Sequence, residues 1–426
     1  MLDIRFVRDN SELVEKSAAA KGYKVDIAKL LEVDDNRRKL IQETENINQK
    51  RNLLAKAPQL RAVAQEDKPR VADEFKEQIE EGKQLKESLA KIEAQLGPVN
   101  EEFDKLLRDI PNVIPDDTPQ GGEENNRQEK TWGDTTQRAA KDHLTWAEER
   151  GLLDFERGAK VAGNKFYFTK GSLVELEFAV LQLGLKLAKE QGFMPMLVPH
   201  MVSGRIIDGA GFTAKSEEEK QIYKIEGEDL HLIATAEIPM TGYHADETLA
   251  DVDLPKLYAG YSPAYRLEAG AYGKHSRGLY RVHQFNKLEL YVFCKPEQSE
   301  EWHQKLLALE EKLCQQLEIP YRVVRIAAGD LGAPAYKKYD VEYWTPVDNS
   351  YRELMSVSNV TDYQARRLNI RYKKTDGAGE FVHTLNGTMA AMSRIPIALI
   401  ENRQDEQGNV SIPAALQPYM SGQTSL

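Results

Sequence analysis

The sequence predicts an α+β protein that begins with a helical arm, and three observations support this prediction. Charged side chains occupy 44 of the first 110 positions, and they are sparser in the remainder, where Pro, Gly and aromatic residues concentrate. A seven-residue hydrophobic period runs through the charged part, as in a coiled coil. The second part mixes helical and strand-like stretches without regular βαβ alternation, which favours an antiparallel sheet packed with helices.

Composition narrows the class of protein before any motif is considered. The chain has 426 residues, a net charge of −11, 41% hydrophobic residues and 29% charged residues, which excludes an integral membrane protein and a disordered chain. The acidic balance argues against non-specific coating of nucleic acid or membranes. The N-terminus lacks the apolar core of a signal peptide, and Cys294 and Cys314 cannot form a disulfide framework. We therefore expect a reduced, soluble, cytoplasmic protein.

The arm contains two stretches that each carry a pair of interleaved heptad series. Alternating steps of three and four over several heptads specify a coiled-coil seam. Residues 58–69, bracketed by prolines, are predicted to form a hairpin tip, so the two helices pack antiparallel. Gly97-Pro98 should kink the second helix or restart it there. The seam positions are Leu30, Val33, Arg37, Leu40, Thr44, Ile47, Arg51 and Leu54, and then Leu85, Leu89, Ile92, Leu96, Val99, Phe103, Leu106 and Ile110.

A dimerisation coiled coil is the alternative interpretation of this arm. Arg37 and Arg51 lie on the seam, where they weaken a long dry dimer interface and leave cationic groups that could face phosphates. The arm alone does not decide between the two.

Domain boundaries follow from the change in composition. Residues 110–126 are dense in Pro, Gly, Asp and Asn, which is typical of a linker. We predict an N-terminal domain over residues 1–110, a linker over 111–130 and a second domain over 131–426. In the second domain, helices are expected over residues 173–192 and 299–317, and strands around 257–268, 279–293, 321–327 and 339–344.

The predicted strand over residues 279–293 has one apolar and one polar face. Its period of two puts Leu288, Leu290 and Val292 toward a core. A polar face with cations, a ring and a carboxylate suits a small polar ligand such as a phosphate compound. The alternative is an edge strand with a salt-bridged face. The polar face consists of Arg281, His283, Phe285, Lys287, Glu289 and Tyr291.

Just upstream, Arg266 and Glu268 share one face of another predicted strand, which ends in a loop rich in Gly and basic residues. Such a loop is suited to follow a phosphate backbone. The chain has no GxxxxGK[ST] phosphate loop, no dinucleotide-binding fingerprint and no Cys/His cluster with zinc spacing. We expect no protein-bound zinc, haem or dinucleotide cofactor.

Six segments carry the most specific signal in the sequence. They are the arm and the segments TAEIP (235–239), YRLEAGAYGKHSRGLYRVHQFNKLEL (265–290), GDLGAPAYKKYDVEYW (329–344), YRELMSVSNVTDYQARRLNIRY (351–372) and LNGTMAAMSRIPIALIEN (385–402). Together they resemble the class II aminoacyl-tRNA synthetases, and specifically the bacterial-type seryl-tRNA synthetases. They run in the order of that family and cover essentially the whole chain.

The resemblance implies a class II catalytic domain, an antiparallel sheet flanked by helices, behind a tRNA-binding arm. It implies ATP-dependent ligation of L-serine to its tRNA: the serine carboxylate attacks the α-phosphate of ATP, and the acyl group of the seryl-adenylate then moves to the terminal adenosine of the tRNA. Charge neutralisation and positioning dominate such chemistry. Mg²⁺ accompanies the ATP.

The resemblance also assigns roles to individual residues. Arg266 and Arg394 are the implied catalytic residues; Arg266 contacts the α-phosphate and the serine carboxylate, and Arg394 contacts the terminal phosphates. Glu353 and Ser356 are the implied Mg²⁺ ligands. The implied ATP-binding residues are Arg266, Leu267, Glu268, Arg281, Phe285, Glu353, Leu354, Met355, Ser356 and Arg394, and the implied serine-binding residues are Thr235, Ala236, Glu237, Glu289, Asn386 and Thr388. Seen alone, Glu353 and Arg394 could be ordinary ion pairs.

The implied partners follow from the same resemblance. The arm would contact the long variable arm of the serine tRNA, read by shape and backbone, and selenocysteine tRNA would be served where it exists. The helix expected over residues 173–192 and the stretch that follows it to Pro199 resemble the motif that forms the dimer interface, so a homodimer is expected.

The sequence leaves two rival functions and one structural question open. One rival is a related ligase that loads an amino acid onto a carrier protein, which would not need the long arm. The other is a coiled-coil scaffold with a non-catalytic body, which would have lost its phosphate-binding arginines. Pro396 lies where the family's last motif should be helical, so we expect that helix to begin near residues 392–393 or to kink at the proline.

Overall fold

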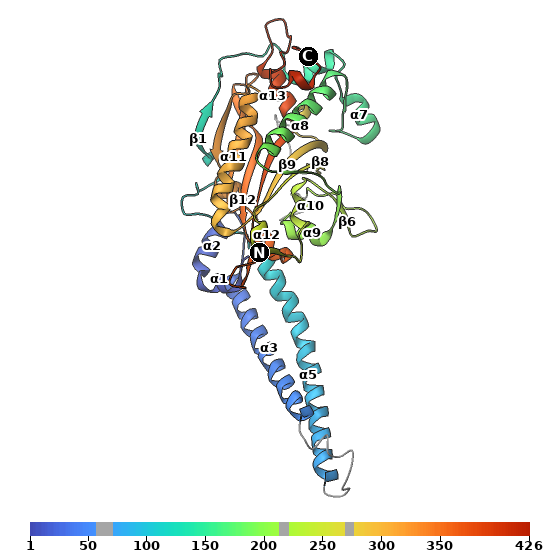
Figure 1. Cartoon of the computed structure of the whole chain (residues 1–426), viewed down its shortest axis with the longest axis vertical. Helices are drawn as coiled ribbons and strands as arrows, with labels where there is room; N and C mark the ends of the chain where they lie inside the picture. The colour runs from blue at the N-terminus through green and yellow to red at the C-terminus, as the bar shows by residue number, and fades with distance from the viewer. Residues whose placement is uncertain (57–70, 213–220, 269–276) are drawn as a thin grey trace. The chain divides into compact units, whose positions relative to one another are not determined.

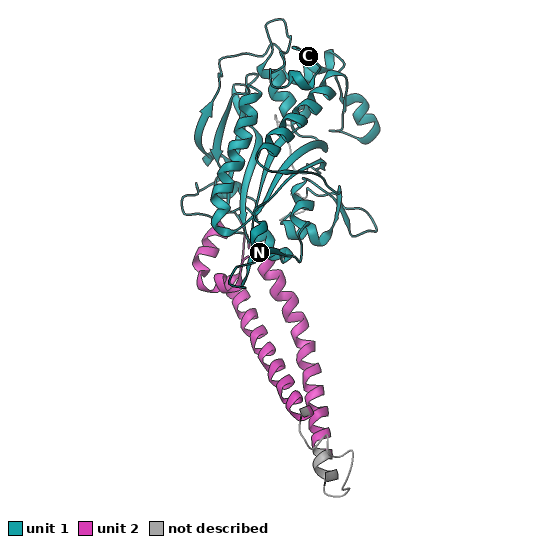
Figure 2. Ribbon diagram, viewed as in Figure 1, with its two compact units in different colours: residues 1, 20–22, 111–426 teal, residues 2–19, 23–110 magenta. Residues whose placement is uncertain are grey.

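A computed structural model of the chain describes residues 1–56, 71–212, 221–268 and 277–426. The chain forms two compact units, coloured separately in Figure 2: residues 2–19 and 23–110 make one, and residues 1, 20–22 and 111–426 make the other. The hairpin tip predicted for residues 58–69 lies outside the described residues. The predicted domain boundaries stay predictions.

The first unit is dominated by two long helices. α3 (Ile27–Lys56) and α5 (Val71–Arg108) run side by side (Figure 1), after the short helices α1 (Ile4–Asp9) and α2 (Ser11–Ala20). The heptad pattern is confirmed, because the seam residues that are most buried come from both helices. They are Leu30, Val33, Leu40, Leu89 and Phe103, and the seam residue Ile110, which follows α5, is buried as well.

Two details of the arm differ from a plain apolar seam. Arg37 on the seam donates from Nε to Oδ1 of Asn100 at 2.9 Å, and its guanidinium lies 4.5 Å from the ring centre of Phe103. Contrary to one of the two expectations for Gly97-Pro98, α5 does not restart there, because Pro98 lies inside one continuous helix. A proline removes a single backbone hydrogen bond, and in α5 the long seam against α3 compensates for that loss.

The second unit is built on an eight-stranded sheet. Its strand order is β1-β10-β11-β12-β15-β9-β8-β4, and every pairing is antiparallel except that of β4 with β8. The predicted antiparallel sheet is thus confirmed, with one parallel edge strand. The strands are β1 (Arg127–Trp132), β4 (Met194–Leu197), β8 (Lys256–Tyr265), β9 (Gln284–Cys294), β10 (Tyr321–Arg325), β11 (Lys337–Thr345), β12 (Ser350–Thr361) and β15 (His383–Ala391).

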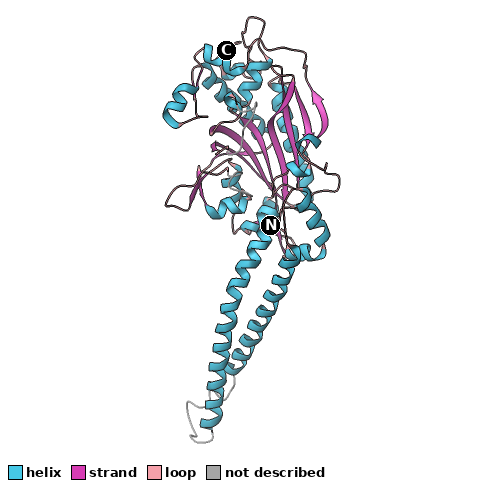
Figure 3. Ribbon diagram, turned by 180° about the vertical axis from the view of Figure 1, so that it is seen from behind, coloured by secondary structure: helices cyan, strands magenta, loops and turns pink. Residues whose placement is uncertain are grey.

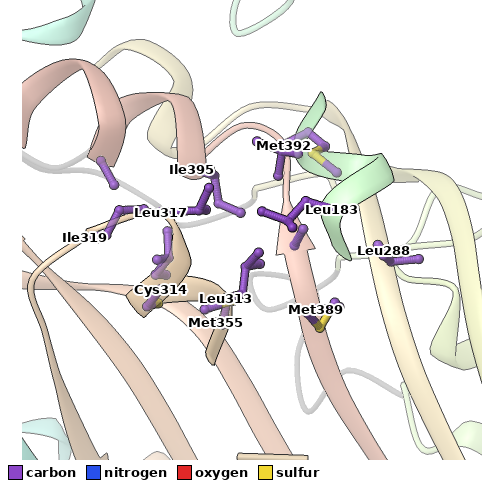
Figure 4. Close-up of a cluster of buried hydrophobic side chains, with 14 of the residues drawn as sticks. Leu183, Leu288, Leu313, Cys314, Leu317, Ile319, Met355, Met389, Met392 and Ile395 are labelled. Carbon is purple, nitrogen blue, oxygen red and sulfur yellow. The ribbon is translucent and has the colours of Figure 1, made fainter. Parts of the chain in front are cut away.

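Helices cover the sheet on both sides (Figure 3). On one side, α8 (Ser172–Glu190) and α11 (Ser299–Gln316) bury a large apolar cluster against β9, β12 and β15, part of which is drawn in Figure 4. On the other side, α9 (Gly204–Ala210), α10 (Glu237–Gly242) and α12 (Tyr363–Leu368) enclose a second apolar cluster. The helices predicted over residues 173–192 and 299–317 are therefore confirmed.

The remaining elements are short and lie around this framework. None of the helices within the described part of the chain is long and apolar enough to cross a membrane. The short elements are α6 (His143–Glu149), β2 (Leu153–Asp154), α7 (Phe155–Ala162), β3 (Phe168–Thr169), β5 (Met201–Ser203), β6 (Leu230–Leu232), β7 (Thr248–Ala250), β13 (Arg371–Lys373), β14 (Gly379–Phe381) and α13 (Ile395–Asn402).

The strand expected over residues 279–293 starts later than predicted. β9 begins at Gln284, and residues 278–280 form a short 3-10 turn instead. Gly278 has a φ of +67°, a left-handed conformation that does not belong to a pleated strand. The alternation from Phe285 onward is confirmed, because Leu288, Leu290 and Val292 lie in one apolar cluster and Tyr291 lies in the other. Arg281 and His283 consequently precede the strand.

The proline in the last helix is accommodated at its start. α13 begins at Ile395, so Pro396 lies in the first turn, where its missing N–H would be unpaired in any case. The expectation of a late start is therefore confirmed, two residues beyond the predicted position. Arg394, the N-cap residue of this helix, is one of the expected site residues.

Candidate functional site

A β-bulge in β12 brings two oxygen-bearing side chains to one face of the sheet. Met355 pairs with Val341 of β11, and the next paired residue is Glu353, so Leu354 is an extra residue in the ladder. The side chains of Leu354 and Met355 both lie in the apolar core, which leaves Glu353 and Ser356 together on the opposite face. Leu354 and Met355 therefore have only their backbone to offer a nucleotide.

Glu353 is held by Arg394 at the start of α13. Nη1 of Arg394 forms an ion pair with Oε2 of Glu353 at 3.2 Å and donates to the backbone carbonyl of Glu353 at 3.1 Å. Burial acts to raise the pKa of Glu353, but attraction to Arg394, Lys338 and Arg266 outweighs it and lowers the pKa to about 2. Glu353 is thus ionised at neutral pH. A carboxylate and the Ser356 hydroxyl on one face form a donor set that fits Mg²⁺.

Arg266 lies at the centre of the expected site, just after β8. Its guanidinium is 5.2 Å from the ring centre of Phe285 on β9. Burial and then the positive charge of Arg394 lower the pKa of Arg266, whereas the charges of Glu268, Glu353 and Glu289 act in the opposite direction. One cation therefore interacts with residues predicted for ATP and with a residue predicted for serine.

Glu268 and Arg281 pair beside this arginine. Nη1 of Arg281 lies 3.2 Å from Oε2 of Glu268. The backbone N–H groups of Leu267 and Glu268 donate to Gln221, to its carbonyl at 3.0 Å and to its side-chain Oε1 at 3.2 Å. The chain after β8 is therefore fixed, and its carboxylate faces a cation that precedes β9.

A buried carboxyl group marks the pocket predicted for serine. Oε1 of Glu237 accepts from Nδ2 of Asn386 at 3.0 Å and from Nε2 of Gln364 at 2.9 Å. Oγ1 of Thr235 accepts from the Glu237 backbone N–H at 3.2 Å. Burial, and then repulsion from Glu289, raises the pKa of Glu237 to about 7. A cation placed between two buried acidic groups, such as Glu237 and Glu289, would stabilise their ionised forms.

The remaining residues predicted for serine are buried near this carboxyl group. Glu289 forms a buried ion pair with Lys287 two residues earlier on β9. Thr388 lies opposite Glu289 in the β9–β15 ladder, and both are almost fully buried. Ala236 is fully buried and belongs to the apolar cluster on that side of the sheet.

Sequence reasoning missed three polar residues of this face. Nζ of Lys338 lies 2.9 Å from Oδ1 of Asp340, and burial raises the pKa of Asp340 to about 7 although Lys338 opposes it. Lys338 and Asp340 are two residues apart on a strand, and this spacing in the sequence could have indicated that they share one face. Gln364 accepts at Oε1 from the hydroxyls of Tyr291 and Thr384, at 2.8 and 2.7 Å. Nothing in the local sequence pattern singles out this glutamine.

Comparisons with known proteins agree with this fold and site. Residues 220–403 match the family model described as the tRNA synthetase class II core domain (G, H, P, S and T), and residues 1–114 match the seryl-tRNA synthetase N-terminal domain. Serine–tRNA ligases from Dictyoglomus turgidum and Dictyoglomus thermophilum are 44% and 45% identical, over 99% of this chain and 98% of each relative. The chain belongs to the seryl-tRNA synthetase family.

The solved structures that resemble this chain are also seryl-tRNA synthetases. The crystal structure of seryl-tRNA synthetase from Pyrococcus horikoshii complexed with ATP has a TM-score of 0.89 and 36% identity, and covers 100% of this chain and 99% of that one. The cytoplasmic serine–tRNA ligase from Naegleria fowleri in complex with AMP has a TM-score of 0.85 and 30% identity, over 100% of this chain and 98% of that one.

Proposed function

We propose that this chain activates L-serine with ATP and transfers it to tRNA through the residues around Arg266. Membership of the seryl-tRNA synthetase family, over nearly the full length of relatives at 42–45% identity, carries the activity itself. The alternative of loading a carrier protein is not favoured, because residues 1–114 match the N-terminal domain of this family. The assignment of roles to individual residues is supported by the geometry of the site.

The phosphate part of the reaction needs cations where negative charge develops. The nucleophile is a serine carboxylate oxygen, which forms a bond to the α-phosphorus while the bond to pyrophosphate breaks. Arg266 contacts the α-phosphate, and its Nε donates to the backbone carbonyl of Ala234 at 3.3 Å. Arg394 contacts the terminal phosphates and is paired with Glu353 before the substrate arrives. Phe285 supplies a ring on which the adenine stacks, with Glu268 and Arg281 beside it.

Mg²⁺ is the metal ion that we propose for this site. Glu353 and Ser356 would hold it, and the ion would neutralise charge on the phosphates of ATP when it is bound. The low pKa of Glu353 keeps its carboxylate available as a ligand throughout the physiological range.

The serine pocket recognises an ammonium group and a hydroxyl group. Glu237 and Glu289 repel one another, and a bound ammonium group would relieve that repulsion. Thr388 and Asn386 are within the same buried wall and can bond the hydroxyl. Alanine would leave both of these polar groups unpaired, at a combined cost on the order of 3 kcal/mol or more.

A homodimer through α8 and β4 is part of the proposal. β4 is an edge strand of the sheet, yet Met194 is 60% and Leu197 84% exposed, and Phe178 of α8 is 53% exposed. An apolar edge of this kind needs a cover. Sedimentation of the chain should give twice its 48.3 kDa mass, and the variant Phe178→Glu/Leu197→Glu should shift it to the monomer. A native monomer would contradict the dimer.

The arm and the compartment complete the proposal. We propose that the arm contacts serine tRNA, and selenocysteine tRNA where that tRNA exists, through cationic side chains along its helices. We also propose that the enzyme works in the cytoplasm.

ATP–pyrophosphate exchange with each of the twenty amino acids tests the activation step. Serine alone should support rapid exchange, and alanine and threonine should support less than about a hundredth of that rate, because a missing hydroxyl or an added methyl disrupts the buried polar pocket. Exchange that is equally fast with another amino acid, or absent with serine, would contradict the assignment of Glu237, Glu289 and Thr388 to serine.

A further inference from the structure

A buried histidine lies behind the phosphate part of the site and has no role in the function proposed above. His143 is the first residue of α6, and the helix is capped by Asp142, whose Oδ1 accepts from two backbone N–H groups. His143 is 5% exposed. Its ring bridges two segments that are far apart in the chain, namely residue 279 and the end of α13.

The hydrogen bonds fix which nitrogen of the ring carries the proton. The backbone N–H of Leu279 lies 3.3 Å from Nε2 of His143 and can only donate, so Nε2 is the acceptor. Nδ1 lies 2.8 Å from Oε1 of Glu401 and therefore carries the proton that it donates to this carboxylate. The geometry thus requires a neutral ring with its proton on Nδ1.

The carboxylate that orients the ring is itself held from two directions. Oε1 of Glu401 also accepts from the backbone N–H of His143 at 3.3 Å, and Oε2 accepts from the hydroxyl of Thr345 on β11 at 3.1 Å. Glu401 is 3% exposed. A buried carboxylate with three donors is a rigid support for the imidazole.

The ring also fits closely against the turn that it holds. A Cβ on Gly278 would lie 2.3 Å from Nε2 of His143, and the φ of +67° at Gly278 is a second reason for glycine there. The 3-10 turn over residues 278–280 therefore rests directly on the imidazole, and its position follows the position of the ring.

Tyr280, the last residue of that turn, contacts the site arginine Arg394. The ring of Tyr280 is buried, with its centre 4.8 Å from the guanidinium carbon of Arg394 and 5.6 Å from that of Arg352. Cations over an aromatic face are stabilised by about 0.5–2 kcal/mol. A shift of the turn would thus move the surface on which Arg394 rests, while leaving the serine pocket untouched.

We propose that His143 is a positioning residue for ATP binding: it holds the Gly278–Tyr280 turn, and through Tyr280 it sets the orientation of Arg394. This inference rests on the proposed contact between Arg394 and the terminal phosphates of ATP. The important bond is the one from the Leu279 N–H to Nε2, because it joins the turn to the ring.

Two amide variants separate the bonds that the ring makes. In His143→Gln the amide oxygen can occupy the place of Nε2 and accept from Leu279, whereas in His143→Asn the amide N–H can replace Nδ1 and donate to Glu401. His143→Ala removes both bonds. ATP–pyrophosphate exchange with serine gives KM for ATP, KM for serine and kcat for each full-length variant, and urea unfolding gives its stability.

The proposal predicts that His143→Asn and His143→Ala raise KM for ATP about tenfold, the effect of losing one well-placed hydrogen bond. KM for serine stays unchanged, and His143→Gln stays within about threefold of the native KM for ATP. If the role of His143 were purely structural, the loss of activity in each variant would parallel its loss of stability, and KM would rise for ATP and serine alike. That outcome, or an unchanged KM for ATP in all three variants, overturns the proposal.

The variant Arg394→Lys separates this inference from the function on which it rests. If Arg394→Lys leaves KM for ATP unchanged, the proposed role of Arg394 is wrong, and the inference from His143 fails with it. If Arg394→Lys raises KM for ATP while the histidine variants do not, the role of Arg394 holds and only the inference from His143 is overturned.

Discussion

Single residues in the serine pocket are held in protonation states that differ from those in an unfolded chain. Glu237 is the clearest case, because its pKa of about 7 lies above its ordinary value of 4.5. The native state therefore binds a proton more tightly than the unfolded state, and the free energy of unfolding falls as the pH rises from about 4.5 to about 7 and levels off above that.

Replacing this carboxyl group by an amide should remove that pH dependence. In Glu237→Gln the amide oxygen can still accept from Asn386 and Gln364, but no charge forms beside Glu289. The variant should match the native chain near pH 4 and exceed it by about 3 kcal/mol in free energy of unfolding at pH 8, at about 1.4 kcal/mol per pKa unit. Its KM for serine should rise, because the ammonium group loses a partner.

Urea unfolding at pH 4, 6 and 8 measures the effect, and Glu247→Gln serves as a control because that carboxylate is about half exposed. A stability difference between Glu237→Gln and the native chain that stays constant from pH 4 to pH 8 would show that the pKa of Glu237 is not raised.

Most residues of the candidate site can be found from the sequence, because they lie in short segments that resemble a known family, but their grouping cannot. A strand period of two puts Glu353 with Met355, whereas the bulge at Leu354 reverses this and groups Glu353 with Ser356. The choice of Leu354 as the bulged residue depends on pairing with β11, which is a long-range contact. The role of Gln364 cannot be predicted from the sequence for the same reason, because its hydrogen-bond partners come from α10, β9 and β15.

At the scale of elements, the position of a proline decides its cost. Pro396 lies in the first turn of α13, where Pro396→Ala should change the free energy of unfolding by less than about 1 kcal/mol. The matched change two residues later, Ala398→Pro, should cost about 3 kcal/mol or more, since the Ala398 N–H donates to the Arg394 carbonyl at 3.1 Å.

Thermal and urea unfolding of these two variants would check the start of α13. A gain of about 3 kcal/mol in the free energy of unfolding for Pro396→Ala would mean that the helix begins before Ile395, because the proline would then lie in the helix interior. The sequence predicted this start within two residues, because helix boundaries follow local chemistry. It also allowed α5 to restart at Pro98, which was wrong, because tertiary contact along the seam overrides the local preference.

At the scale of the whole molecule, the account assigns activation of serine to one unit and tRNA recognition to the arm. The Arg37–Asn100 bond gives the register of the two arm helices, so residues 45–92 can be replaced by a short Gly/Ser turn without disturbing that bond or the Arg37–Phe103 contact. The shortened chain should keep serine-dependent ATP–pyrophosphate exchange within about twofold. Its charging of tRNA should fall about 100-fold, equivalent to about 3 kcal/mol of lost tRNA affinity.

Both activities are measured on the same preparation, so a folding defect would be visible as a loss of exchange. Full charging by the shortened chain would assign tRNA recognition to the second unit. The heptads predicted the arm itself, because a coiled-coil seam is a local and periodic signal; what the arm binds follows only from the family.

Charging of total tRNA by the intact chain, with ATP and labelled serine, tests the central claim most directly. Label is expected on serine tRNA, linked to its terminal adenosine, and no label is expected without ATP. Serine-dependent exchange without any charged tRNA, or charging with a different amino acid, would contradict the assignment of this chain's activity.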